Sequence, residues 1–127
     1  MKALPIIALF LVALNSCEER KNEPLHTSRV HVQSVDIPSH VAFGQPITFE
    51  VTCTTPTPCW EFDTFEIKRD GHEHEVQVVA RSDDRPCIQI LGSFKATGSV
   101  TPTERGTYTF KFWRAQAPSL DVDVIVQ

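Results

Sequence analysis

The stretch that decides the fold is Gly106-Thr107-Tyr108-Thr109-Phe110-Lys111-Phe112-Trp113. Polar and aromatic residues alternate in it, so Tyr108, Phe110 and Phe112 share one face of an extended chain. Such alternation is typical of a β-strand with one face in a hydrophobic core. The segment 120–126 repeats the pattern, with Leu120, Val122, Val124 and Val126 in register, while Asp121 and Asp123 lie on the other face. The two segments are therefore predicted to be paired strands that bury the same interior.

The same period of two recurs from Arg29 to Gln127, broken at short intervals by Gly, Pro or Asp. No window keeps the three-to-four spacing of an amphipathic helix. Asp70-Gly71 predicts a tight hairpin, and 87–91 and 93–100 are expected to be two further strands. We therefore expect one all-β domain at 29–127, a two-sheet sandwich of seven or eight strands.

Gly106-Thr107-Tyr108-Thr109-Phe110 resembles the Gly-x-Tyr-x-Phe entry to the F strand of bacterial immunoglobulin-like domains. The whole layout is similar to small, uncharacterised lipoproteins of Gram-negative bacteria that carry one such domain. The resemblance implies an immunoglobulin-like sandwich in which Tyr108 closes the corner between strands E and F, with Trp60 as the candidate core tryptophan of strand C. Phe110 stands where antibody domains have a cysteine, so neither an antibody-type disulfide nor antibody-like recognition is implied.

The first residues predict the cellular location of the protein. One basic residue and the apolar run 3–14, too short to span a bilayer, are typical of a secretory signal peptide. Leu14-Asn15-Ser16-Cys17 resembles the lipobox of bacterial lipoproteins, in which the cysteine becomes the lipidated first residue. We expect a signal peptide at 1–16, a lipid on Cys17 and a polar, flexible tether at 17–28. The protein would then be anchored to a membrane of the bacterial cell envelope, facing the periplasm or the cell surface.

Three cysteines remain for the domain, and outside the cytoplasm a disulfide is expected. Cys53 is in register with the apolar residues of 47–53, so it is predicted to be buried and reduced. Cys59 and Cys87 each follow a proline at the start of a predicted strand, and we expect the bridge to join them. The alternative is Cys53 with Cys59, which would close the loop between them.

The distribution of charge argues against a nucleic-acid partner. The chain has 12 Lys and Arg against 16 Asp and Glu, a net charge of −4, and its basic residues are dispersed among acidic ones. Contact with phosphate backbones needs clustered Lys and Arg. We therefore expect no nucleic-acid partner.

Two stretches are candidate sites. His72 and His74 lie two apart in the hairpin, where one face of a strand could present both imidazoles to zinc or copper. The alternative is a charged hairpin tip, since two histidines need a third ligand. The proline-rich loop Thr54, Thr55, Pro56, Thr57 and Pro58 is stiff enough to be presented to a partner, as protease inhibitors present a rigid segment. Its alternative is a plain connection between strands.

The sequence gives little support for catalytic activity. The sequence has neither a Gly-x-Ser-x-Gly elbow nor a phosphate-binding glycine loop. We expect no catalytic residues and no cofactor. The preferred interpretation is a lipid-anchored, non-catalytic module that makes protein contacts or gives structural support at the cell envelope. A periplasmic zinc- or copper-binding protein and an inhibitor of secreted proteases are the alternatives.

Overall fold

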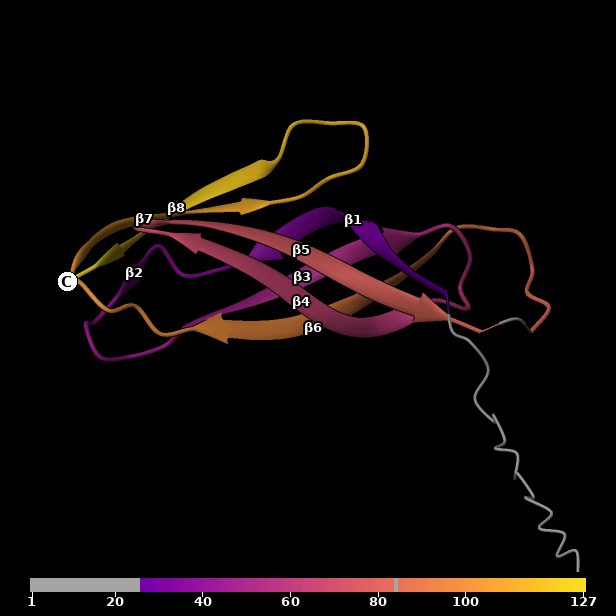
Figure 1. Ribbon diagram of the computed structural model, residues 1–127, viewed down its shortest axis with the longest axis horizontal. Helices are drawn as coiled ribbons and strands as arrows, with labels where there is room; N and C mark the ends of the chain where they lie inside the picture. The colour runs from indigo at the N-terminus through magenta and orange to yellow at the C-terminus, as the bar shows by residue number, and fades with distance from the viewer. Residues whose placement is uncertain (1–25, 84) are drawn as a thin grey trace, which may run out of the picture.

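The computed structural model describes residues 26–83 and 85–127, in which every regular element is a β-strand (Figure 1). No helix that could cross a membrane occurs in this part of the chain. The strands are β1 (His26–Asp36), β2 (His40–Val41), β3 (Ile47–Thr55), β4 (Glu61–Asp70), β5 (Glu73–Ser82), β6 (Gly92–Val100), β7 (Gly106–Phe112) and β8 (Leu120–Val126).

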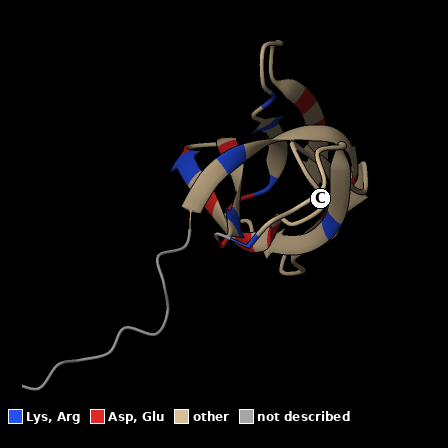
Figure 2. Ribbon diagram, turned by 90° about the vertical axis from the view of Figure 1, so that its right-hand side faces the viewer, with Lys and Arg blue, Asp and Glu red and all other residues tan. Residues whose placement is uncertain are grey.

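The strands form two layers that share β1. Residues 26–30 of β1 pair with β5, and residues 31–36 pair with β3 across an irregularity between Val32 and Ser34. One layer therefore holds the second half of β1 with β3 and β6, and the other holds its first half with β4, β5, β7, β8 and β2. Seen from one end, the strands surround a common interior, and acidic and basic positions are interspersed around it (Figure 2). The predicted all-β sandwich is confirmed.

The pairing differs in two places from the antiparallel sheets of an immunoglobulin domain. The short β2 runs parallel to β8, and β7 runs parallel to the first half of β5. The two predicted hairpins are present as antiparallel pairs: β4 turns into β5 at Gly71, so that Asp70 faces Glu73, and β7 pairs with β8.

The core is centred on Phe49 of β3, which touches aromatic rings of the opposite layer. Its ring centroid lies 5.3 Å from that of Phe65, 5.4 Å from that of Phe112 and 6.2 Å from that of Phe110. The contacts with Phe65 and Phe112 are edge-to-face, and such contacts add to the free energy gained by burying the rings. Tyr108, Phe110 and Phe112 are buried, as the alternation predicts. Of the other residues expected inside, Val124 is buried, whereas Trp60, Leu120 and Val122 are half-buried.

Tyr108 closes the corner that precedes β7. Its hydroxyl donates a hydrogen bond to the carbonyl of Glu104 and accepts one from the amide of the same residue, both at 3.1 Å. This is the arrangement that the Gly-x-Tyr-x-Phe resemblance implies. The two bonds tie the turn 101–105 to the start of the strand.

Two boundaries differ from the sequence prediction. β1 begins at His26, so three residues expected in the tether belong to the sheet. Residues 87–91 are not a strand, although Ile88 and Ile90 alternate with a polar residue. The reason is that the β3–β6 ladder ends with Thr55 opposite Gly92, and Pro56 then removes the next amide donor. The predicted signal peptide and Cys17 lie outside the described residues.

Candidate functional site

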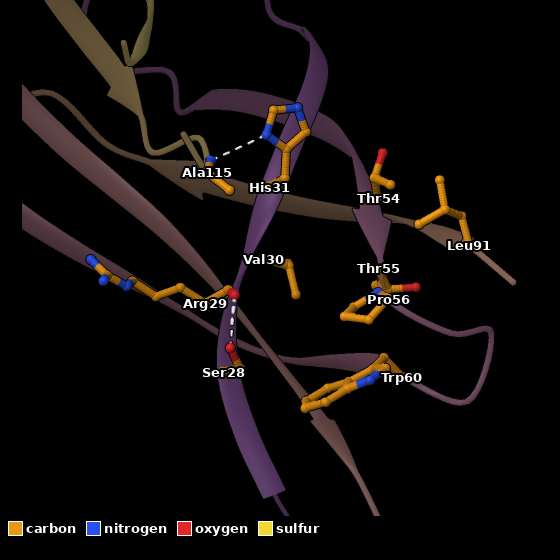
Figure 3. A pocket seen from close by; sticks show the side chains of 10 residues that line it. All are labelled: Ser28, Arg29, Val30, His31, Thr54, Thr55, Pro56, Trp60, Leu91 and Ala115. Carbon is orange, nitrogen blue, oxygen red and sulfur yellow. Dashed lines mark hydrogen bonds between the residues drawn. The ribbon is translucent and has the colours of Figure 1, made fainter. Parts of the chain in front are cut away.

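An apolar pocket opens at the end of the sandwich where β1 begins and β3 ends. Its volume is about 260 Å³, and the side chains of Val30, Pro56 and Trp60 surround it with Leu91 at the rim (Figure 3). These residues come from three segments that the fold brings together: β1, the connection between β3 and β4, and the connection that precedes β6. The full lining is Ser28, Arg29, Val30, His31, Thr54, Thr55, Pro56, Trp60, Leu91 and Ala115. The first three residues of the predicted binding loop therefore form one wall of a pocket.

The loop 54–58 is held by its own hydrogen bonds. Thr55, which is buried, donates from its hydroxyl to the carbonyl of Thr57 at 2.7 Å, and the hydroxyl of Thr57 accepts from the amide of Cys59 at 3.3 Å. Gly92 allows the loop to lie directly on β6, since a Cβ there would be 2.5 Å from the Cα of Pro58. The wall of the pocket is thus shaped before any ligand arrives.

The disulfide of the domain joins Cys59 to Cys87, with the Cα atoms 6.2 Å apart. It links the end of the 54–58 loop to the segment that leads to Leu91, and it confirms the predicted pairing. Cys53 is free and fully buried in β3, as predicted, and burial raises the pKa of its thiol to about 12. At that pKa almost no reactive thiolate forms near neutral pH.

Two polar side chains on the pocket's β1 wall are already engaged elsewhere. The Nδ1 atom of His31 accepts a hydrogen bond from the amide of Ala115 at 3.1 Å. Arg29 turns away from Trp60, and its guanidinium carbon lies 4.3 Å from the ring centroid of Trp113 (Figure 3). The chemistry that the pocket offers a ligand is therefore mainly contact with apolar and aromatic surface.

His72 and His74 occupy different environments beside Tyr108. His72 lies in the turn and stacks on the Tyr108 ring, with centroids 4.3 Å apart, while His74 meets the edge of that ring at 5.6 Å. Both nitrogens of His72 have partners: Nε2 is 2.8 Å from a carboxylate oxygen of Glu104, and Nδ1 is 3.1 Å from the carbonyl oxygen of Thr107. A metal would have to displace these contacts.

Close packing fixes His72 where it is. Gly106 has a φ of +130°, and a Cβ on it would lie 2.9 Å from Cε1 of the imidazole. The residue at this turn must therefore be glycine for the ring to reach Tyr108. No group of three His, Cys, Asp or Glu side chains that could hold a metal occurs among residues 26–83 and 85–127.

His74 is the one buried histidine of the described chain, at 3% exposure. Its Nδ1 atom has no hydrogen-bond partner, and the residue lines a small pocket with Arg69, Thr103 and Tyr108. Burial lowers the pKa of the imidazole, and the positive charge of Arg69 lowers it further. The side chain is thus kept neutral inside the sandwich.

The carboxylate pair Glu61 and Asp63 has a structural partner. Arg81 on the neighbouring strand lies 3.5 Å from an oxygen of Glu61 and 3.2 Å from an oxygen of Asp63. The three side chains are at least one-third exposed, so the pairs contribute little to stability. Asp123, which shares a face of β8 with Asp121, accepts a hydrogen bond from the hydroxyl of Thr109 at 2.8 Å.

The sequence patterns indicate only one wall of the pocket, the 54–58 loop. Trp60 was expected in the core, and nothing in the patterns brought Val30, Leu91 or Ala115 to this site. The available signal was the run Ile-Gln-Ile-Leu at 88–91, which is unusually apolar for a connection between strands and indicates a contact surface. The contact of Glu104 with His72 was missed as well, since 32 residues separate them.

Comparison with known protein families relates the chain to a β-sandwich domain. The family model described as the ORF11 beta-sandwich domain matches residues 49–117, from β3 to the loop between β7 and β8. The matched range includes the 54–58 loop, both cysteines of the disulfide and Leu91. No curated protein and no solved structure matches the chain.

Proposed function

The chain belongs to the ORF11 β-sandwich domain family, and from this premise we propose that it is a lipid-anchored, non-catalytic module that binds a protein partner at the bacterial cell envelope. The β-sandwich is the scaffold, and the pocket beside the 54–58 loop is the binding site. The proposed ligand is an apolar or aromatic side chain on the surface of the partner.

The observation that carries the proposal is the pocket itself. Val30, Pro56 and Trp60 give it an apolar lining, and the disulfide and the hydrogen bonds of the loop hold its wall. Recognition sites in proteins are concave and mostly apolar, and the residues that dominate binding are seated in such pockets. A wall that is ordered in advance also reduces the entropy lost on binding.

The anchor rests on the sequence. The short apolar run followed by Leu14-Asn15-Ser16-Cys17 supports lipidation of Cys17. Changing Cys17 to Ala should release the protein from the membrane fraction of the cells that produce it. Unchanged membrane association, together with no incorporation of a fatty-acid probe into the natural protein, would contradict the anchor.

Photo-crosslinking in intact cells tests the binding site. A photoreactive phenylalanine analogue at Ser28, an exposed position on the rim of the pocket, should give one adduct of defined mass. The matched control carries the analogue at Lys95, an exposed position on β6. Filling the pocket with Thr54→Trp should abolish the adduct at Ser28. The proposal fails if both positions give the same products, or if Thr54→Trp leaves the adduct unchanged.

A further inference from the structure

Exposed aliphatic side chains gather on one loop next to the pocket. Five large hydrophobic residues are exposed among those that the structure describes, and three of them, Ile88 at 62%, Ile90 at 58% and Leu91 at 73%, lie within four positions. We call these three the aliphatic ridge. The other two are Phe43, partly covered by the guanidinium of Arg105 at 4.5 Å, and Ile125. Three neighbouring aliphatic side chains in water indicate a contact surface.

The ridge is held in place at both ends. Cys87 before it is bonded to Cys59, and Gly92 after it is the first residue of β6, packed against Pro58. The four residues between these fixed points carry no charge. Arg85, the charged residue nearest to the ridge in sequence, is paired with Asp83 at 2.7 Å. The ridge is therefore an uncharged projection that its two fixed ends hold outside the core.

The ridge lies at the end of the sandwich where the chain enters β1. His26 is paired with Ser82, the last residue of β5, and the segment that leads to the ridge starts there. Ser28 of β1 and Leu91 of the ridge line the same pocket. His26 comes nine positions after Cys17, and a chain of that length reaches at most about 30 Å. A lipid on Cys17 would hold this end, and not the opposite one, near the membrane.

We propose that the aliphatic ridge rests in the interface of the phospholipid bilayer that holds the anchor. This inference depends on the lipid anchor of the proposed function and adds a second point of membrane contact. Aliphatic side chains gain free energy when they leave water for the boundary between headgroups and acyl chains. Two points of contact fix an orientation: the pocket lies at the membrane surface, and the end that carries Phe43 and Ile125 points away.

An environment-sensitive fluorophore on the ridge tests this contact. The reporter is placed on Gln89→Cys, which lies between Ile88 and Ile90 and leaves the ridge intact; Cys53 is buried and does not compete for the label. The full lipidated protein is bound to vesicles of phosphatidylcholine, with phosphatidylglycerol added in a second arm. A blue shift of emission and quenching by nitroxide-labelled lipids are expected, independent of salt because the ridge is uncharged. The same label on Phe43→Cys, at the other end, should stay accessible to iodide.

Variants separate this contact from the anchor. Ile88→Asp with Ile90→Asp should abolish the blue shift and the lipid quenching, while the protein still floats with the vesicles. Phe43→Asp with Ile125→Asp, matched in charge and in apolar loss, should leave the signal unchanged. A floating protein whose label at position 89 stays open to iodide overturns the inference and leaves the anchor intact, whereas loss of flotation in the natural protein refutes the anchor. Shielding of the label in cell membranes but not in protein-free vesicles would assign the ridge to a protein, which also overturns the inference.

Discussion

Replacing Phe49 with Ala should remove a large part of the stability of the sandwich. The side chain is 1% exposed and touches three aromatic rings of the opposite layer, so neighbouring groups are held from both sides and have little room to fill the gap. Truncation of a buried phenylalanine costs about 3 to 5 kcal/mol. A domain of this size has about 5 to 15 kcal/mol in total. We expect a value in the upper half of the first range, because the edge-to-face contacts are lost together with the buried area.

Urea unfolding of the chain from residue 18 onward measures this cost. With a slope of about 2 kcal/mol per molar, the midpoint should fall by roughly 2 M. Phe43→Ala is the matched control, since Phe43 is 40% exposed and contributes mainly its contact with Arg105; its cost should stay below about 1 kcal/mol. A cost for Phe49→Ala below 1 kcal/mol, or equal to that of the control, would show that the two layers do not meet at this residue.

Three further predictions concern the disulfide and the histidines. Changing Cys59 and Cys87 to Ala should lower the free energy of unfolding by about 3 to 4 kcal/mol, the value that the chain-entropy model gives for a separation of 28 residues. Urea unfolding measures this loss, and a value under about 1 kcal/mol would contradict the prediction. Because folding lowers the pKa of His74, the unfolded chain binds more protons than the folded chain below about pH 6.5. Stability should therefore fall as the pH drops from about 7 through 6.5, and it should level off below the pKa of the folded state. His74→Gln should flatten this pH dependence in unfolding curves, and an unchanged slope would exclude His74 as its source. Zinc or copper should bind only weakly by calorimetric titration, since His72 is engaged by Glu104; submicromolar binding lost in His72→Ala with His74→Ala would instead establish the metal-binding alternative.

The period-two patterns predicted the buried face of β7 correctly because this strand buries every second side chain. The burial of Tyr108, Phe110 and Phe112 follows from this periodicity alone. The position of Cys53 in register with its apolar neighbours favoured a disulfide between the other two cysteines of the domain. These are local properties of single strands, and the sequence contains them directly.

What the sequence did not predict depends on which strands become neighbours. Ile88 and Ile90 alternate as strand residues do, but a strand also needs a partner, and β3 has ended where they begin. The pocket combines residues near positions 30, 55, 60, 91 and 115, which only the pairing of β1 with both layers brings together. The parallel pairing of β5 with β7 is of the same kind, since nothing local to either strand specifies it.

The strand shared by the two layers has a mechanical consequence. β1 starts at one end of the molecule, and the C-terminus lies at the other (Figure 1). Tension between the chain ahead of His26 and the far end therefore runs nearly parallel to the strands. It loads the hydrogen bonds between β1 and β5 in shear, so that several must break at once, and β1 passes the load on to β3. A domain built in this way resists being pulled from its N-terminal side, the side on which a lipid anchor at Cys17 would pull.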